Sequence, residues 1–233
     1  MRRCFALAAV CCSLPTIAAA AQEHATDTAA HRGWGRPSFF GVWVSGAKSS
    51  PFVTRVGIRR RDFFAVGTRV GWAIASDSGV AVSYIVDVVP LAVMTNNPTR
   101  YETRSCPPGP ACSFLVQYTG TVVGAGASPL GLQMEIGTRS PVSIQLHGNG
   151  GLLIFSRPTP DPEARRLNFT ASAGAAIEIE LARRLGVSVG YVWHHTSNAG
   201  TAPANPGLDS HMLVVGLVRR REHRQASETA SAR

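Results

Sequence analysis

Apolar residues alternate with small or polar ones along most of this chain, with the period of two that a β-strand requires. Between residues 64 and 74, the even positions include Phe64, Trp72 and Ile74, whereas the odd positions carry glycine, alanine and Arg69. Eight segments of this kind are rich in Val, Ile, Phe, Tyr and Trp. Pro129 raises the alternative that the fourth consists of two pieces joined by a bend. The segments span 38–46, 63–75, 79–91, 119–136, 142–155, 168–181, 185–196 and 209–219.

The two faces of these segments differ in character. Small residues and paired charges suit the narrow lumen of an eight-stranded barrel whose large apolar residues face lipid. We therefore expect Arg69 and Asp87 to form a structural ion pair inside the barrel. A soluble, lipocalin-like barrel is the alternative, and it would reverse the two faces. The charged and amide residues opposite the large apolar ones are Arg69, Asp87, Gln133, Glu135, His147, Glu178 and Glu180.

The lengths of the connections favour the membrane alternative. Short connections follow the second, fourth and sixth segments, and longer ones follow the first, third, fifth and seventh. Outer-membrane barrels show this alternation, with their long loops outside the cell. The predicted fold is therefore all-β, an eight-stranded antiparallel transmembrane β-barrel. Its long connections span about 47–62, 92–118, 156–167 and 197–208.

The two ends of the chain differ from the barrel region. Arg2 and Arg3 precede a mostly apolar stretch that ends in four alanines, which predicts a signal peptide over 1–21 and export. Residues 22–36 are rich in Ala, Thr, His and Gly, and we expect a flexible N-terminal segment there. The outer-membrane barrel is assigned to 37–220, and a polar C-terminal tail to 221–233.

Charge and cysteine content narrow the choice of partners. The formal net charge is +9, yet no basic stretch is interleaved with aromatic residues, and no nucleic-acid-binding motif is present. The arginine clusters 59–61 and 219–221 suit anionic lipid head groups, or else they are solvated charge at strand ends. In an exported protein we expect Cys106 and Cys112 to form a disulfide, because a metal site would need more ligands nearby.

Candidate chemistry is concentrated near the C-terminus. Period two puts His195 and Ser197 on one face at the end of the seventh segment, and Asp209 begins the eighth. Residues two apart on a strand are separated by about 6.6 Å, and a hairpin neighbour lies about 5 Å away, so we expect Asp209 opposite or diagonal to His195. A hydroxyl nucleophile, a general base and an orienting carboxylate form the set that an acyl-ester hydrolase needs. Asn198 is placed to offer its side-chain amide or backbone N–H to an oxyanion.

Two other motifs near these segments allow different interpretations. His194 and His195 could suggest a metal, but adjacent residues of a strand point to opposite faces and do not chelate together easily. Gly148, Gly150 and Gly151 predict a bulge rather than a phosphate loop, because no helix follows them. We predict neither a metal nor a cofactor.

The C-terminal motif also resembles a known family. His195-Thr196-Ser197-Asn198-Ala199, followed by an Asn-x-Gly motif and Asp209, is similar to the lipid A 3-O-deacylase family of PagL type. Its members are eight-stranded outer-membrane barrels with a Ser-His-acid triad that faces lipid. The resemblance implies that Ser197 is the nucleophile, His195 the base and Asp209 the acid, where the best-known enzymes have glutamate. It extends over roughly residues 37–218.

The predicted function is that of a serine-type carboxylic-ester hydrolase. By the resemblance, it would remove the 3-O acyl chain from lipid A of lipopolysaccharide in the outer leaflet of the cell outer membrane. Its partners would be this substrate and the surrounding lipid, with no nucleic acid, and the sequence leaves open whether the chain forms a homodimer. The alternatives are a non-catalytic outer-membrane barrel with a structural or adhesion role, and an esterase of broader range that also cleaves phospholipids.

Overall fold

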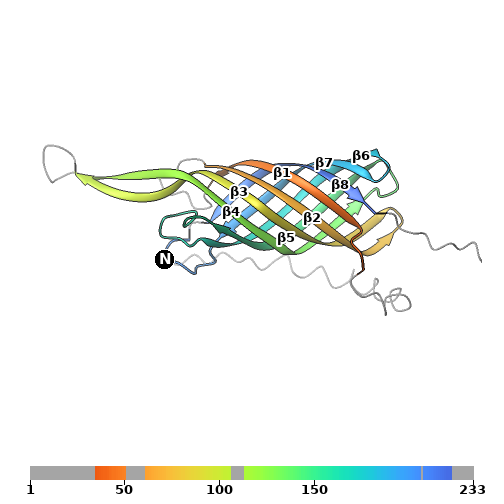
Figure 1. Ribbon diagram of the computed structural model, residues 1–233, viewed down its shortest axis with the longest axis horizontal. Helices are drawn as coiled ribbons and strands as arrows, with labels where there is room; N and C mark the ends of the chain where they lie inside the picture. The colour runs from red at the N-terminus through yellow and green to blue at the C-terminus, as the bar shows by residue number, and fades with distance from the viewer. Residues whose placement is uncertain (1–34, 51–60, 106–112, 206, 222–233) are drawn as a thin grey trace, which may run out of the picture. The chain divides into compact units, whose positions relative to one another are not determined.

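Eight antiparallel strands form a closed barrel in the computed structural model (Figure 1). The structure describes residues 35–50, 61–105, 113–205 and 207–221. Each strand pairs with its neighbours in sequence, and β1 pairs with β8 to close the barrel. This confirms the predicted fold class. The strands are β1 (Phe39–Ser50), β2 (Arg61–Asp77), β3 (Val80–Ser105), β4 (Ser113–Ile136), β5 (Val142–Phe155), β6 (Leu167–Ala182), β7 (Leu185–Ser197) and β8 (Leu208–Arg220).

The chain divides into two compact units, Met1–Arg36 and Pro37–Arg233, and all eight strands belong to the second. Among the described residues, no helix is long and apolar enough to cross a membrane. The predicted signal peptide and the Cys106–Cys112 pair lie outside the described residues, as do nearly all of the two predicted terminal segments.

The connections define two ends of the barrel. We call the end where β7 finishes and β8 begins the long-loop end, because the connections 51–60, 106–112, 156–166 and 198–207 all belong to it. At the opposite, short-turn end, β2 and β3 are joined by Ser78 and Gly79, whose φ angles of 44° and 93° make a tight hairpin turn. The predicted alternation of short and long connections is thus present in the structure.

Large apolar side chains cover the outside of the barrel. Leu130 and Leu213 are 71% and 70% exposed, and most of the outward positions of all eight strands are likewise apolar. The opposite face of the same strands points inward and carries buried polar residues such as Asp87 and Gln133. An apolar band of this extent suits lipid and would not be stable in water. The soluble, lipocalin-like alternative is therefore wrong.

Charged residues inside the barrel are paired, as the sequence predicted for Arg69 and Asp87. The guanidinium of Arg69 donates from Nε and Nη2 to the carboxylate of Asp87 at 2.8 and 2.9 Å. Arg69 Nη1 also donates to Gln133, and the amide of Asn149 donates to Asp87. Paired in this way, the charges can stay in a lumen that gives them little water.

The arginine clusters behave differently from either sequence-based interpretation. Arg220 turns inward at the short-turn end, where it donates to Glu135 at 2.8 Å through both Nη atoms and to Glu178 at 2.7 Å. Arg61 is also buried, with 2% of its surface exposed. One member of each cluster therefore belongs to the barrel interior, because inward and outward positions alternate even within a run of arginines.

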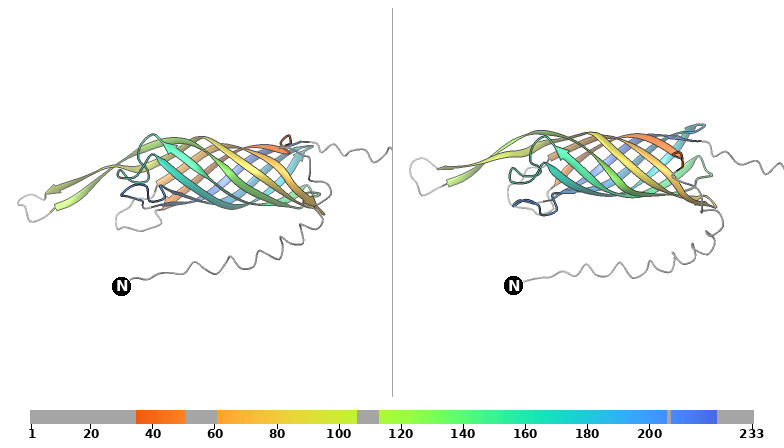
Figure 2. Two further views of the ribbon diagram at one scale, coloured as in Figure 1. Left: turned by 90° about the horizontal axis from the view of Figure 1, so that it is seen from below. Right: turned by 60° about the horizontal axis from the view of Figure 1, so that its bottom comes forward.

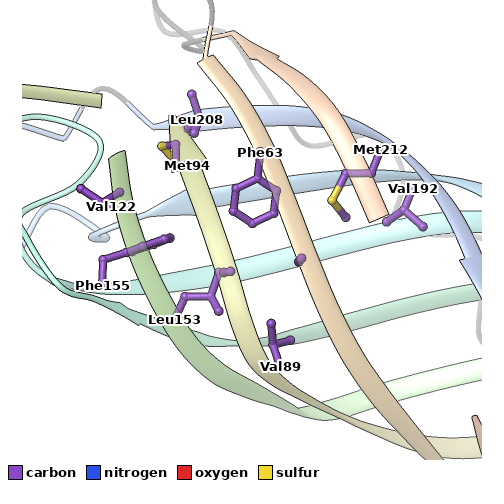
Figure 3. Close-up of a cluster of buried hydrophobic side chains, with 11 residues drawn as sticks. Phe63, Val89, Met94, Val122, Leu153, Phe155, Val192, Leu208 and Met212 are labelled. Carbon is purple, nitrogen blue, oxygen red and sulfur yellow. The ribbon is translucent and has the colours of Figure 1, made fainter. Parts of the chain in front are cut away.

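An apolar cluster fills the lumen toward the long-loop end (Figure 3). The sequence predicted only small residues and paired charges for the lumen, and this part of that prediction is wrong. Near this end apolar residues occupy both faces of the strands, so the pattern alone does not show which face points inward. Close packing then excludes water from this part of the lumen. The cluster consists of Phe63, Ala65, Val89, Ala92, Met94, Val122, Leu153, Phe155, Val192, Leu208 and Met212.

Strands β3 and β4 are much longer than predicted. The sequence analysis placed a loop over 92–118, but pairing continues from Asn97–Gly120 to Ser105–Ser113. These residues form a two-stranded ribbon that extends past the other strands in all three views (Figures 1 and 2). Its cross-strand contacts are polar and aromatic, with Arg104 and Glu102 both bonded to the Tyr118 hydroxyl. Such pairs support a ribbon without the apolar alternation on which the prediction depended.

Strand β4 is continuous through Pro129, so it is one bulged strand rather than two. The register shifts between Ala127 and Leu130 on β4, opposite Gly151 of β5. The bulge therefore lies in β4, whereas the sequence placed it among the glycines of β5. A Cβ atom on Gly151 would lie 2.2 Å from the carbonyl oxygen of Ala127, so glycine permits this close approach.

Candidate active site

The candidate site lies on the outer face of the β7–β8 hairpin, at the long-loop end. Along β7, buried and more exposed residues alternate over the last six positions, as expected for a strand with one face in the lumen. The outward positions of the two strands pair directly across the hairpin. From the long-loop end inward, the outer face carries Ser197, His195, Trp193 and Tyr191 on β7, and Asp209, His211 and Leu213 on β8.

His195 and Asp209 are direct cross-strand partners and are hydrogen-bonded to each other. The distance between His195 Nδ1 and Asp209 Oδ1 is 2.8 Å. Their side chains are 28% and 14% exposed, so the pair is partly shielded but reachable from the outer surface. When Nδ1 carries the proton that it donates to the carboxylate, Nε2 keeps the lone pair that a general base needs.

The ring of His195 has one further neighbour of substance on this face. The indole of Trp193 is stacked beside it, with ring centroids 5.9 Å apart and an interplanar angle of 24°. On the β6 side, the cross-strand partner of His195 is Ala171, whose methyl group provides little surface to pack against. The imidazole is therefore held mainly by Asp209 through one nitrogen and by Trp193 along one face.

Ser197 is the last residue of β7 and occupies the next outward position after His195. Two residues along a strand correspond to about 6.6 Å between Cα atoms, which is within the reach of a serine and a histidine side chain. On β6 its cross-strand partner is Phe169, an exposed aromatic residue of the lipid-facing band. The structure thus brings His195 and Asp209 into contact and places Ser197 next to them on the same face.

Asn198 directly follows Ser197, and its polar groups are engaged within the loop that joins β7 to β8. Its backbone N–H donates to Asn205 Oδ1 at 3.0 Å, and its side-chain Nδ2 donates to the carbonyl oxygen of Ala204 at 2.7 Å. Its Oδ1 accepts from the backbone N–H of Gly200 at 3.0 Å. The residue is fully buried. The backbone N–H that the sequence offered to an oxyanion is thus committed to the loop, as is one hydrogen of the side-chain amide.

Asn205 is a residue to which the sequence analysis assigned no role, although it noted the Asn-x-Gly motif. Its side chain helps to fold the chain back after Ser197, where Ala199 and Gly200 adopt left-handed φ angles of 52° and 75°. A left-handed alanine is strained and persists only where surrounding contacts enforce it. Arg165 also donates to the carbonyl oxygen of Thr201 at 2.6 Å, which ties this loop to the β5–β6 connection.

His194 points into the barrel, away from His195. Its Nδ1 is 2.8 Å from the Ser172 hydroxyl and its Nε2 is 3.1 Å from the Thr196 hydroxyl. Its ring stacks on Phe63 at 5.7 Å between centroids. The two adjacent histidines therefore do not face a common ligand. In the part of the chain that the structure describes, no group of three or more His, Cys, Asp or Glu could hold a metal ion.

His211 lies next to the site on the outer face of β8, opposite Trp193. Its Nδ1 is hydrogen-bonded to the hydroxyl of Tyr191, and the two rings stack at 6.0 Å between centroids with an angle of 25°. The outer face of the hairpin thus contains two aromatic–histidine stacks of similar geometry. Only the upper one, Trp193–His195, includes a histidine bonded to a carboxylate.

This arrangement can support proton transfer to and from a nucleophile at the lipid-facing surface. A carboxylate orients an imidazole through Nδ1, and a primary hydroxyl occupies the adjacent outward position on the same strand. Exposed apolar residues, including Phe169, Tyr191 and Leu213, surround these polar groups. A substrate that reaches them therefore approaches through the lipid-facing band rather than through the lumen, where the apolar cluster is close-packed.

Comparison with known proteins relates the chain to an enzyme family. Residues 103–218 match the family described as "Lipid A 3-O-deacylase (PagL)". No curated protein matches the sequence. Among solved structures, the outer membrane enzyme PagL is similar over 76% of this chain and 97% of its own, with 15% identity and a TM-score of 0.53. Neisserial surface protein A matches over 80% and 99% of the two chains, with 12% identity and a TM-score of 0.46.

Proposed function

This chain is an outer-membrane barrel of the PagL type, and from that premise we propose that it is a serine-type esterase that removes an ester-linked acyl chain, the 3-O chain, from lipid A. The observation that carries the proposal is the hydrogen bond between His195 and Asp209 on the lipid-facing surface, with Ser197 at the next outward position. The matched segment, 103–218, includes all three residues.

In the proposed reaction, Ser197 Oγ attacks the ester carbonyl carbon while His195 Nε2 accepts the hydroxyl proton. Asp209 stabilises the imidazolium that forms, through the hydrogen bond to Nδ1. The tetrahedral intermediate collapses when His195 returns the proton to the leaving sugar hydroxyl, which leaves the acyl chain on Ser197. Water, activated by the same imidazole, then releases the fatty acid and restores the serine.

The developing oxyanion needs hydrogen-bond donors, and we propose Asn198 as one of them. One amide hydrogen is used by Ala204, so the contribution would come from the other hydrogen of Nδ2. A donor of this kind is worth roughly 3–4 kcal/mol of transition-state stabilisation in other hydrolases. The loop contacts of Asn198 would keep this amide in place beside Ser197 before substrate arrives, so that little reorganisation is needed.

The position of the site at the long-loop end explains how a lipid could serve as substrate. The ester bonds of lipid A lie near the polar boundary of the outer leaflet, and Ser197 lies where the apolar band gives way to loops. The membrane already concentrates and aligns such a substrate, so a shallow surface site can replace a deep pocket.

Mass spectrometry of lipid A tests the proposal. Cells expressing the wild type should lose one hydroxyacyl chain from lipid A, and Ser197→Ala should lower this activity by about a thousandfold or more. Ser188→Ala is a matched control, because Ser188 lies on the same strand but lines the lumen, and it should retain activity. An unchanged spectrum for a wild-type protein that is folded in the outer membrane would instead favour the non-catalytic barrel. Cleavage of phospholipids at a similar rate would favour the broader esterase.

A further inference from the structure

We infer that Trp193 is a positioning residue for the proposed base: its indole fixes the plane of the His195 ring and stabilises the charge that this ring acquires in the transition state. The inference rests on the proposed function and adds to it a residue that lies outside the Ser-His-Asp set. It is based on the stacking of the two rings, whose centroids are 5.9 Å apart at an angle of 24°.

The need for such a residue follows from where His195 lies. Catalytic histidines in soluble enzymes are usually packed on several sides by the protein core, but this ring projects from the outer surface of a barrel. Its β6 partner, Ala171, contributes only a methyl group. The hydrogen bond to Asp209 restrains one ring atom and leaves the ring plane free to tilt about that contact. A stacked indole removes this freedom, because the offset stacking of aromatic rings has a preferred geometry.

The indole also favours the charged form of the ring. The face of Trp attracts a cation, most strongly where water is excluded, as it is beside lipid. His195 becomes a cation only after it accepts the Ser197 proton, so this attraction operates in the transition state and not in the resting enzyme. Interactions that strengthen only in the transition state raise kcat rather than tighten substrate binding. The loss caused by removing the indole should therefore appear in kcat.

The same hairpin provides a matched control. Tyr191 stacks on His211 at 6.0 Å and 25°, on the same strand, on the same face and two residues further from Ser197. Replacing Tyr191 removes the same kind of stack from the lipid-facing surface but leaves His195 and its partners untouched. The effects of removing an aromatic residue from the membrane boundary can thus be separated from effects on the base.

The experiment measures kcat and KM for the full-length protein, folded in detergent micelles, with purified lipopolysaccharide as substrate. We expect Trp193→Leu to lower kcat about tenfold while KM changes less than about twofold. Trp193→Phe should restore most of kcat, because it keeps an aromatic face beside His195. Tyr191→Leu should have the kinetics of the wild type. Folding of each variant is checked by the heat-dependent shift of its band in gel electrophoresis.

The outcomes separate this inference from the proposed function. Wild-type kcat in Trp193→Leu, or a loss confined to KM, would overturn the positioning role while leaving the esterase intact. A Trp193→Phe variant no better than Trp193→Leu would also overturn it. If Trp193→Leu does not fold, Trp193→Phe and Trp193→Met are compared instead, and equal kcat values would count against the inference. A wild type no more active than Ser197→Ala would end both proposals.

Discussion

His194 and His195 are neighbours in the chain, yet they lie in two different environments on opposite faces of β7. His194 is buried in the lumen, where both of its ring nitrogens are bonded to hydroxyl groups and its ring packs on Phe63. His195 lies on the lipid-facing surface, where one nitrogen is bonded to the Asp209 carboxylate. The inner histidine is bonded at both nitrogens, whereas the outer one has a partner that orients it and stabilises its cation.

The difference shows how a barrel of one layer separates stability from chemistry. A strand places successive side chains on opposite faces, so the inner set can pack and pair without restricting the outer set. The inner face holds the ion pairs Arg69–Asp87 and Arg220–Glu135 and the apolar cluster. The outer face holds the candidate site. Substitutions on the two faces should accordingly affect different measurements.

The largest effect is expected from Asp209→Asn on the outer face. The amide keeps the shape of the side chain but no longer stabilises the imidazolium and can favour the wrong tautomer of His195. We expect kcat to fall by about 10³- to 10⁴-fold, with the unfolding midpoint in urea unchanged. Deacylation rates and urea titrations of the protein in micelles provide both numbers. A variant with nearly normal kcat would show that the His195–Asp209 bond is structural only.

A smaller effect, on stability alone, is expected from Arg69→Met on the inner face. It leaves the Asp87 carboxylate, 3% exposed, without its cation. Breaking a buried pair in this way costs about 3–5 kcal/mol of unfolding free energy. Arg100→Met is the matched control, because the Arg100–Glu102 pair is exposed, and an exposed pair contributes at most about 1 kcal/mol. The deacylation rate per folded molecule should not change in either variant, and a lower rate in Arg69→Met would mean that the two faces are coupled.

The smallest effect is expected from His194→Phe, which tests the neighbouring position directly. The new ring can keep the stack on Phe63, but the hydroxyls of Ser172 and Thr196 lose their partner. The cost should be about 1–3 kcal/mol of unfolding free energy, because buried polar groups are left unsatisfied. Activity should stay near that of the wild type. If kcat fell as far as in Asp209→Asn, the inner histidine would have to be counted with the site.

The candidate site could be predicted well from the sequence because it depends on local geometry. His195 and Ser197 share a face through the period of two, and a short hairpin loop limits the positions at which Asp209 can pair. The structure places Asp209 directly opposite His195. The partners of Asn198 could not be predicted in this way. They depend on how the loop closes on Ala204 and Asn205, and several loop conformations are compatible with the same residues.

The sequence by itself determined the strand number, the inward and outward faces and the alternation of connection lengths, because each follows from the period of a strand and from turn residues. Only the tertiary structure decided the long β3–β4 ribbon, the bulge at Pro129 and the inward turn of Arg220. These features depend on cross-strand partners that are distant in sequence, such as Glu135 for Arg220. Barrel closure also decided which apolar residues fill the lumen, since only packing across the lumen reveals how much space remains between the strands.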